Sequence, residues 1–245
     1  MNNKLFGDIK ILLNTLIIDI LILLNTLIIG SFPIIASFFS RTGNIPHLIA
    51  RLWARLILII GRIPVKVQGQ HNLVPDKPFI YMANHQSNVD IPVLLACLPV
   101  QFRWLAKAEL FRIPLFGRSM KSCGYISIDR SNRKSAFESL SLAAKKISRG
   151  TSVMIFPEGT RGSGGKLLPF KKGGFILAID AGVPIIPVII QGTGSIMPKG
   201  SFLIRPRPVV LKICKPIATT NFTRKTRDDL LNEVKGVIQK AFESV

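Results

Sequence analysis

The chain has 245 residues, and its 33 Lys and Arg against 13 Asp and Glu give a formal net charge of +20. Hydrophobic residues make up 48% and charged residues 19%, which excludes a disordered chain, and the length suffices for one α/β domain with a full core. A mean hydropathy of +0.38 indicates contact with lipid. The positive charge predicts an anionic partner: nucleic acid, an anionic membrane or a phosphorylated substrate.

The first forty residues form a neutral apolar arm. Two Lys and two Asp cancel there, so the whole net charge belongs to residues 41–245. Ile11–Ile29 is an almost unbroken run of Ile and Leu, long enough as a helix to cross about 30 Å of hydrocarbon. The octet ILLNTLII occurs at 11–18 and again at 22–29. Along a helix, one narrow stripe therefore carries Asp8, Thr15, Asp19, Thr26 and Gly30.

Three placements of this arm are open. It spans the membrane, it lies in the interface or re-enters with the stripe facing water or the protein body, or it is a buried helix of a soluble core. A cleaved signal peptide is disfavoured, because the run is too long and no A-x-A site follows it. We expect a membrane anchor, with the body on the cytoplasmic side if the arm spans.

A second helix is predicted from about Ile45 to Ile60, after breaks at Phe32-Pro33 and at 41–44. His47, Arg51 and Arg55 follow a spacing of four, which predicts a basic stripe at anionic headgroups, with a solvated face of a soluble helix as the alternative. We therefore assign residues 1–62 to membrane-anchoring helices and 63–245 to an α/β domain.

The body alternates short apolar strands with helical stretches. The expected strands are Val65–Gly69, Phe79–Ala83, Phe102–Ala106, Gly124–Ile128, Val153–Phe156, Ile185–Ile190 and Val209–Cys214. The expected helices are Asp90–Leu98, Asn132–Ser148 and a C-terminal helix from about Asp228. This order predicts an α/β fold with a mixed, mostly parallel sheet covered by helices.

One histidine lies at a predicted strand exit. His85 follows the strand 79–83, and Asp90 opens the next helix, so the carboxylate can hold one imidazole nitrogen and leave the other free to accept a proton. Asp90 before Ile91-Pro92 is alternatively a helix N-cap. No nucleophile elbow is present, and the scattered His and Cys residues predict no metal site and no disulfide framework, as in a reducing compartment.

A glycine-rich loop follows the strand 153–156. Residues 157–166 read PEGTRGSGGK, in which Gly165 stands where a P-loop requires Lys, so nucleotide binding is disfavoured. The loop instead presents Arg161, with Lys166, Lys171 and Lys172 close behind, which suits recognition of a phosphate. A plain surface turn is the alternative.

Taken together, five ordered motifs resemble one family. They are NHQSNVD at 84–90, AKAELFRIPLFG at 106–117, GYISIDR at 124–130, PEGTRG at 157–162 and VPIIPV at 183–188. In this order they resemble the membrane-associated glycerolipid acyltransferases and, within them, the 1-acyl-sn-glycerol-3-phosphate (lysophosphatidic acid) acyltransferases. Ser127 and Asn88 depart from the usual pattern, which bears on the shape of the acyl pocket.

The resemblance implies roles for named residues. His85 is the implied base that deprotonates a lysophospholipid hydroxyl, Asp90 orients it, and the acyl thioester is attacked without a covalent acyl-enzyme. The implied substrate-binding residues are Lys107, Arg130, Glu158, Gly159, Thr160 and Arg161. Alternatively, Arg130 is a capping residue, and Lys107 pairs with Glu109 or Asp129.

The expected activity is transfer of an acyl group to the sn-2 hydroxyl of lysophosphatidic acid, giving phosphatidic acid at the cytoplasmic membrane face. The resemblance implies an acyl carrier protein or coenzyme A thioester as co-substrate, no cofactor, and no nucleic acid as partner. The positive charge suits these phosphorylated or acidic partners and anionic lipid. The alternatives are another lysolipid acceptor, such as a lyso-aminolipid, or a membrane-tethered basic binding protein.

Overall fold

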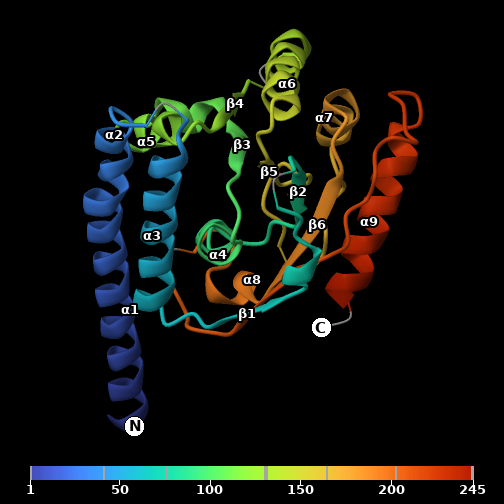
Figure 1. Ribbon diagram of the computed structural model, residues 1–245. Coiled ribbons are helices and arrows are strands. Elements are labelled where there is room, and N and C mark those ends of the chain that lie inside the picture. The colour runs from blue at the N-terminus through green and yellow to red at the C-terminus, as the bar shows by residue number, and fades with distance from the viewer. Residues whose placement is uncertain are drawn as a thin grey trace.

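The computed structural model describes residues 2–40, 42–75, 77–129, 132–163, 165–201 and 203–243, without the side chains of 2–12 and 133. Over these residues, seven strands form one sheet, in the order β1-β7-β6-β2-β5-β3-β4 (Figure 1). The strands are β1 (Val65–Gln68), β2 (Ile80–Ala83), β3 (Arg103–Lys107), β4 (Ile126–Ile128), β5 (Val153–Ile155), β6 (Ile185–Gln191) and β7 (Val209–Ile213). Each coincides with a predicted strand to within about two residues.

The sheet is mixed and mostly parallel, which confirms the predicted fold class. Only the pairing of β6 with β7 is antiparallel among the described strands, and β1 lies parallel to β7 at the edge. Strand β6, which reads IIPVIIQ, is buried over its first six residues. Such a continuous apolar run is typical of a central strand covered on both faces.

Helices cover both faces of the sheet (Figure 1). They are α1 (Asn2–Ile28), α2 (Phe32–Ala36), α3 (Asn44–Ile60), α4 (Asp90–Cys97), α5 (Phe116–Ser122), α6 (Arg133–Ser148), α7 (Gly173–Ala181), α8 (Thr193–Ile196) and α9 (Arg227–Glu243), with 3₁₀ turns η1 (Ile29–Ser31), η2 (Gln70–Asn72) and η3 (Ala108–Arg112). One apolar core joins the sheet to α3 and α4, and a second joins it to α6, α7 and α9.

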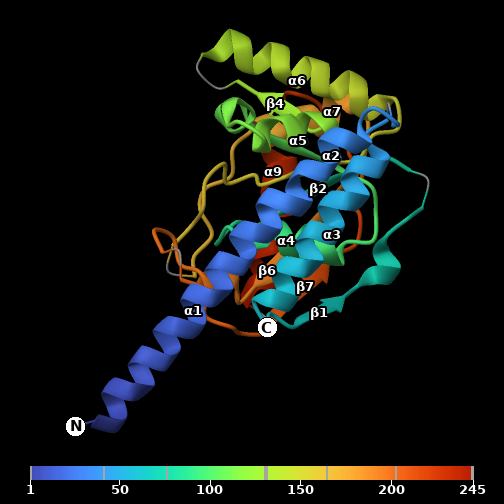
Figure 2. The same ribbon diagram turned by 90° about the vertical axis from the view of Figure 1, so that its left-hand side faces the viewer.

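The N-terminal arm is one nearly continuous helical rod. Phe32-Pro33 does not end it, contrary to the prediction: η1 leads directly into α2, where Pro33 lies in the first turn and no N–H is needed. Leu13–Ala36 is 24 residues long and, by length and composition, is able to cross a membrane. Helix α1 runs beside α3, and its N-terminal end projects past the body (Figure 2).

The predicted stripe on α1 faces the body over part of its length. Thr15 is buried, the indole of Trp53 donates to Thr26 Oγ1 at 3.1 Å, and the Ser119 hydroxyl donates to the Gly30 carbonyl at 2.5 Å. The side chain of Asp8 lies outside the described residues. The opposite side of α1 exposes a row of Leu and Ile side chains, so the arm combines a docked face with an apolar outer face.

Helix α3 is oriented differently from its prediction. His47 is fully buried and Arg51 donates to the Leu95 carbonyl at 3.2 Å, so these two members of the predicted stripe face the body, whereas Arg55 is exposed. Leu48, Leu52 and Ile59 are exposed instead. Spacing alone placed these residues on one face, but the packing against α4 decided which face turns inward.

Helices α5 and α7 were not predicted. Helix α7 begins with two glycines and is apolar almost all round, so it lacks the polar face by which an amphipathic helix is detected. Helix α5 has only seven residues, between Pro114 and Gly124. Helix α5 lines the pocket described below, whereas α7 packs in the core with α6 and α9, and both depend on burial for their stability.

Candidate active site

The predicted pair of His85 and Asp90 forms in the structure. His85 Nδ1 lies 2.8 Å from Asp90 Oδ2, and Asp90 is fully buried. His85 is the second residue after the central strand β2 and Asp90 opens α4, so the end of this strand and the start of the helix hold the two side chains together. With Nδ1 bonded to the carboxylate, Nε2 is the ring nitrogen left to accept a proton.

Backbone donors fix the carboxylate. Asp90 Oδ2 also accepts from the backbone N–H of Gln86 at 2.7 Å and of Ser87 at 2.9 Å. Asp90 is the first residue of α4 and accepts from residues before it, so it is not the N-cap of the helix, which is Val89. These bonds stabilise the ionised carboxylate where it faces the imidazole.

The loop between β2 and α4 is attached to the sheet. The side chain of Asn84 is buried and exchanges two hydrogen bonds with the backbone of Ile190 in β6, at 2.8 and 2.7 Å. The imidazole of His85 stacks on the ring of Phe156, with centroids 3.8 Å apart. Neither Asn84 nor Phe156 was a predicted site residue, although Asn84 is the first residue of the motif at 84–90 and Phe156 directly precedes the motif at 157–162.

Glu158 is buried beneath the site instead of lining it. Its Oε1 accepts from the His85 backbone N–H at 2.7 Å, and its Oε2 accepts from Leu168 at 2.8 Å. Burial raises the pKa of this carboxyl above its ordinary value, although the two hydrogen bonds act in the opposite direction. The geometry gives Glu158 a positioning role, which differs from the expected contact with substrate.

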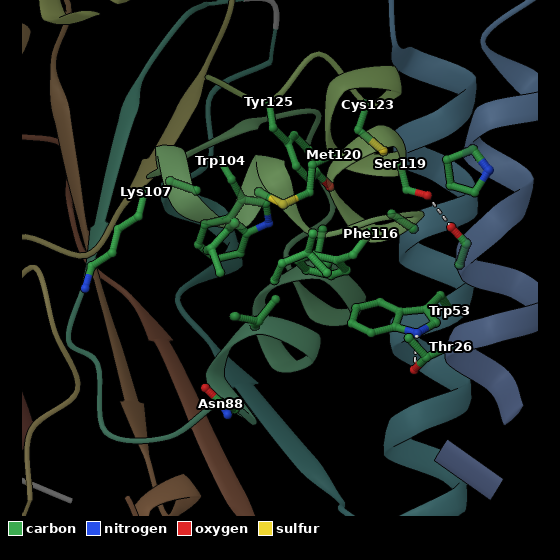
Figure 3. A pocket seen from close by; sticks show the side chains of 18 of the residues that line it. Thr26, Trp53, Asn88, Trp104, Lys107, Phe116, Ser119, Met120, Cys123 and Tyr125 are labelled. Atoms are coloured by element: carbon green, nitrogen blue, oxygen red, sulfur yellow. Dashed lines mark hydrogen bonds between the residues drawn. The ribbon is translucent and has the colours of Figure 1, made fainter. Parts of the chain in front are cut away.

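An apolar pocket of about 730 Å³ extends from His85 toward the N-terminal helices. In Figure 3, Asn88 and Lys107 lie at one end, and Thr26 and Trp53 lie at the other, against α1 and α3. The lining between them is aromatic and aliphatic, with Trp104, Leu110, Phe116, Met120 and Phe156 among its residues. A volume of this size and character suits an extended hydrocarbon chain.

Neutral polar groups line the pocket against α5 and β4. Tyr125 and Cys123 lie there, and Tyr125 Oη is 3.3 Å from His47 Nδ1. Burial raises the pKa of Cys123 to about 12 and raises that of Tyr125 well above its ordinary value. These groups are therefore uncharged, and this part of the pocket remains compatible with an apolar ligand.

Cations lie at the His85 end of the pocket. Arg161, Thr160 and Gly159 line it together with Lys107, so the structure brings these residues of the two motifs to one end of the pocket. Lys107 is exposed, and Arg161 is partly exposed. Arg130 lies outside the described residues. Of the two departures from the family pattern, Asn88 lines the pocket, whereas Ser127 is exposed on β4 and is not part of the lining.

Among the described residues, no group of three His, Cys, Asp or Glu side chains is placed to hold a metal ion. Cys97, Cys123 and Cys214 are free thiols.

The fold and the site define an α/β domain with a histidine–carboxylate pair at one end of a lipid-sized pocket. A family model described as Acyltransferase matches residues 64–191, about half of the chain. The chain therefore belongs to the acyltransferase family, which confirms the resemblance inferred from its motifs.

Relatives with named activities cover most of the chain. It is 39% identical to a chloroplastic 1-acyl-sn-glycerol-3-phosphate acyltransferase of Brassica napus, over 69% of this chain and 49% of that protein. It is 33% identical to the 1-acyl-sn-glycerol-3-phosphate acyltransferase of Saccharomyces cerevisiae, over 85% of this chain and 73% of that one. The chain thus spans about half the length of the Brassica protein and about three quarters of the yeast protein.

A solved structure shares the fold throughout. The 1-acyl-sn-glycerophosphate (LPA) acyltransferase PlsC from Thermotoga maritima superposes with a TM-score of 0.82 at 30% identity, over 96% of each chain. The similarity includes the N-terminal helices as well as the sheet, because it covers nearly the whole of both chains.

Proposed function

We propose that this protein transfers an acyl group from an acyl thioester to the sn-2 hydroxyl of 1-acyl-sn-glycerol-3-phosphate, giving phosphatidic acid. The observation that carries the proposal is the His85–Asp90 pair, held at 2.8 Å at one end of an apolar pocket. The relatives from Brassica and yeast and the Thermotoga structure support it by the activities in their names.

The chain's own residues account for each step. His85 Nε2 accepts the proton of the acceptor hydroxyl while the oxygen attacks the thioester carbonyl carbon. The tetrahedral intermediate collapses with cleavage of the C–S bond, and the imidazolium returns the proton to the departing thiolate. The buried carboxylate of Asp90 stabilises the imidazolium in between. No covalent acyl-enzyme and no cofactor are needed in this scheme.

Two regions of the site suit different parts of the substrates. Arg161 and Lys107 suit the phosphate of the acceptor, because guanidinium and ammonium groups form charge-assisted hydrogen bonds to it. The apolar pocket suits an acyl chain. In this arrangement the thiol carrier remains outside the pocket. Because the pocket does not select the carrier, both acyl carrier protein and coenzyme A are candidate donors.

The location proposed for the reaction is the cytoplasmic face of a membrane. The exposed apolar side of α1 and the 24-residue run Leu13–Ala36 support membrane association. Lys and Arg are concentrated after residue 40, which favours the cytoplasmic side for the body if the arm spans.

The deciding experiment measures acyl transfer from labelled acyl carrier protein and from acyl-CoA to a panel of lysolipids. We expect preference for lysophosphatidic acid and a fall in kcat of about 10²-fold to 10⁴-fold or more in His85→Ala, the usual contribution of a general base. His71→Ala is the matched control, because His71 is exposed in η2. Transfer to a different lysolipid would replace the acceptor, and full activity in His85→Ala would refute the mechanism.

Absence of transfer to every acceptor would reopen the alternative of a membrane-tethered basic binding protein. Retention of nucleic acid that is sensitive to salt and undiminished by added lipid would then support that alternative.

A further inference from the structure

One basic segment at the site takes no part in the proposed chemistry. Residues 197–208 connect α8 to β7 and carry three exposed cations, Lys199, Arg205 and Arg207. Leu203 lies between them in sequence and is 41% exposed. No Asp or Glu occurs anywhere from residue 181 to residue 227, so the positive charge of this segment is not compensated locally in sequence.

The described residues on either side of position 202 are anchored to the fold. Ile204 is buried in the core shared with α3 and α4, and the Arg205 backbone N–H donates to the Ile196 carbonyl at 2.9 Å. Ser201 closes a turn onto Pro198 and accepts from the Leu203 backbone N–H through its hydroxyl. These contacts on either side of Leu203 hold its side chain at the surface.

The segment also adjoins the site. The Ser87 hydroxyl donates to the Met197 carbonyl at 2.8 Å, and Lys199 Nζ donates to the Arg161 carbonyl at 3.2 Å. Figure 2 shows the connection, in orange, beside the middle of α1 and next to the loop that follows β5. The exposed apolar side chains of α1 in this stretch include Leu16, Ile17, Ile20, Leu23, Leu24 and Leu27.

We propose that the described residues of this segment, 197–201 and 203–208, form a second membrane contact, which rests on anionic phospholipid headgroups beside α1. An exposed leucine between cations suits an interface in which the apolar group enters the acyl boundary and the cations meet the phosphates. An acidic protein would satisfy the charges, but it would not account for Leu203 or for the continuity with the apolar face of α1. The contact holds the loop of Arg161 at the level where a lipid phosphate lies.

The test attaches an environment-sensitive fluorophore to the full chain at Leu203→Cys. Its emission is compared in buffer, with phosphatidylcholine vesicles, and with vesicles that also contain phosphatidylglycerol, in the absence of substrates. We expect a blue shift with the anionic vesicles that weakens at high salt, since surface charge is screened. Lys146→Cys on α6 is the control site, because it is exposed on another face, and the unsubstituted chain gives the background from Cys97 and Cys214.

A charge variant measures the electrostatic part. In Lys199→Gln/Arg205→Gln/Arg207→Gln, the ratio of partitioning into anionic over zwitterionic vesicles should fall roughly a hundredfold, at about 1 kcal/mol for each cation. The contribution of α1 cancels in this ratio. Lys145→Gln/Lys146→Gln/Lys235→Gln is the matched control on α6 and α9.

Two results would overturn the proposal. A fluorophore at 203 that stays in an aqueous environment with every vesicle would show that the segment does not touch lipid. A shift produced by an acidic carrier protein and not by vesicles would make it a protein-docking surface. Neither measurement requires turnover, so their failure is distinct from a failure of the proposed acyl transfer.

Discussion

A single oxygen of Asp90 receives three donors, one from the imidazole of His85 and two from the backbone. Its other oxygen, Oδ1, is buried and has no hydrogen-bond partner within the described part of the chain. The carboxylate therefore binds both the imidazole of His85 and the backbone of the loop that carries it. This arrangement couples the geometry of the base to the backbone of residues 85–87.

Arg161 is the residue at which acceptor recognition is best tested. Removal of its guanidinium in Arg161→Ala should raise the acceptor KM about tenfold or more, because a hydrogen bond to a charged group contributes about 1.5–3 kcal/mol. The donor KM should change little. Arg161→Lys keeps the charge without the bidentate geometry and should fall in between. An unchanged acceptor KM with a higher donor KM would assign this loop to the acyl donor.

Glu158 supports the site through both of its oxygen atoms. In Glu158→Gln one of the two oxygens becomes an NH₂ group. This group cannot accept a hydrogen bond from the backbone N–H that it faces, whether that of His85 or that of Leu168. We expect kcat/KM to fall by about tenfold or more, since a buried donor left unpaired costs about 1–3 kcal/mol. Steady-state kinetics measures this, and Glu138→Gln on the exposed face of α6 is the control. Wild-type kinetics in Glu158→Gln would remove its positioning role.

The link between α2 and α3 is the part of the anchor that contacts β3 of the sheet. The buried guanidinium of Arg103 in β3 donates to the carbonyl of Thr42 at 3.1 Å and to Asn44 Oδ1 at 2.5 Å. Gly43, between them, has a φ of +73°, and a Cβ there would lie 2.8 Å from the carbonyl oxygen of Cys123. The link is thus pressed against the residues that precede β4.

Substitution at this link tests how the anchor is positioned. Gly43→Ala combines a left-handed backbone with a collision and should destabilise the fold by about 3 kcal/mol, whereas Gly182→Ala should cost about 1 kcal/mol. Gly182 is the control, because it has a φ of +65° and open space around its Cβ position. Thermal unfolding of the detergent-solubilised variants compares them. Equal losses would show that the contact with Cys123 is not tight.

On the scale of the whole molecule, the buried His47 joins three parts of the fold. It belongs to α3, its ring packs edge-on against Phe102 with centroids 4.9 Å apart, and it lies 3.3 Å from the hydroxyl of Tyr125. Burial, together with the positive charges of Arg103 and Arg51, lowers the pKa of His47 to about 3. The imidazole is consequently neutral in the folded protein at physiological pH.

This depressed pKa predicts a dependence of stability on pH. The unfolded chain binds a proton at His47 below about pH 6.5, while the folded protein does not until about pH 3. The free energy of unfolding should therefore fall as the pH drops through this window, by on the order of 5 kcal/mol in total at about 1.4 kcal/mol per unit. Chemical unfolding at several pH values tests this. In His47→Gln the decline should be shallower, and parallel profiles would refute the assignment.

The seven strands, the helices α4, α6 and α9, and the pair of His85 and Asp90 were all predictable from the sequence. Strands that are buried on both faces must be apolar throughout, and a short loop after a strand keeps its polar residues within reach of one another. These are local constraints, so the order of residues along the chain is sufficient to reveal them.

Other features were decided only by the tertiary structure. The inward turn of His47 and Arg51, the burial of Glu158 beneath the site, and the pocket between β3, α5 and the N-terminal helices all depend on which surfaces meet after folding. Helical spacing determines which residues share a face, but only packing determines what that face contacts. The sequence by itself therefore determined the class of fold and the pairing of His85 with Asp90, while long-range packing decided the pocket, its depth and the orientation of the anchor toward it.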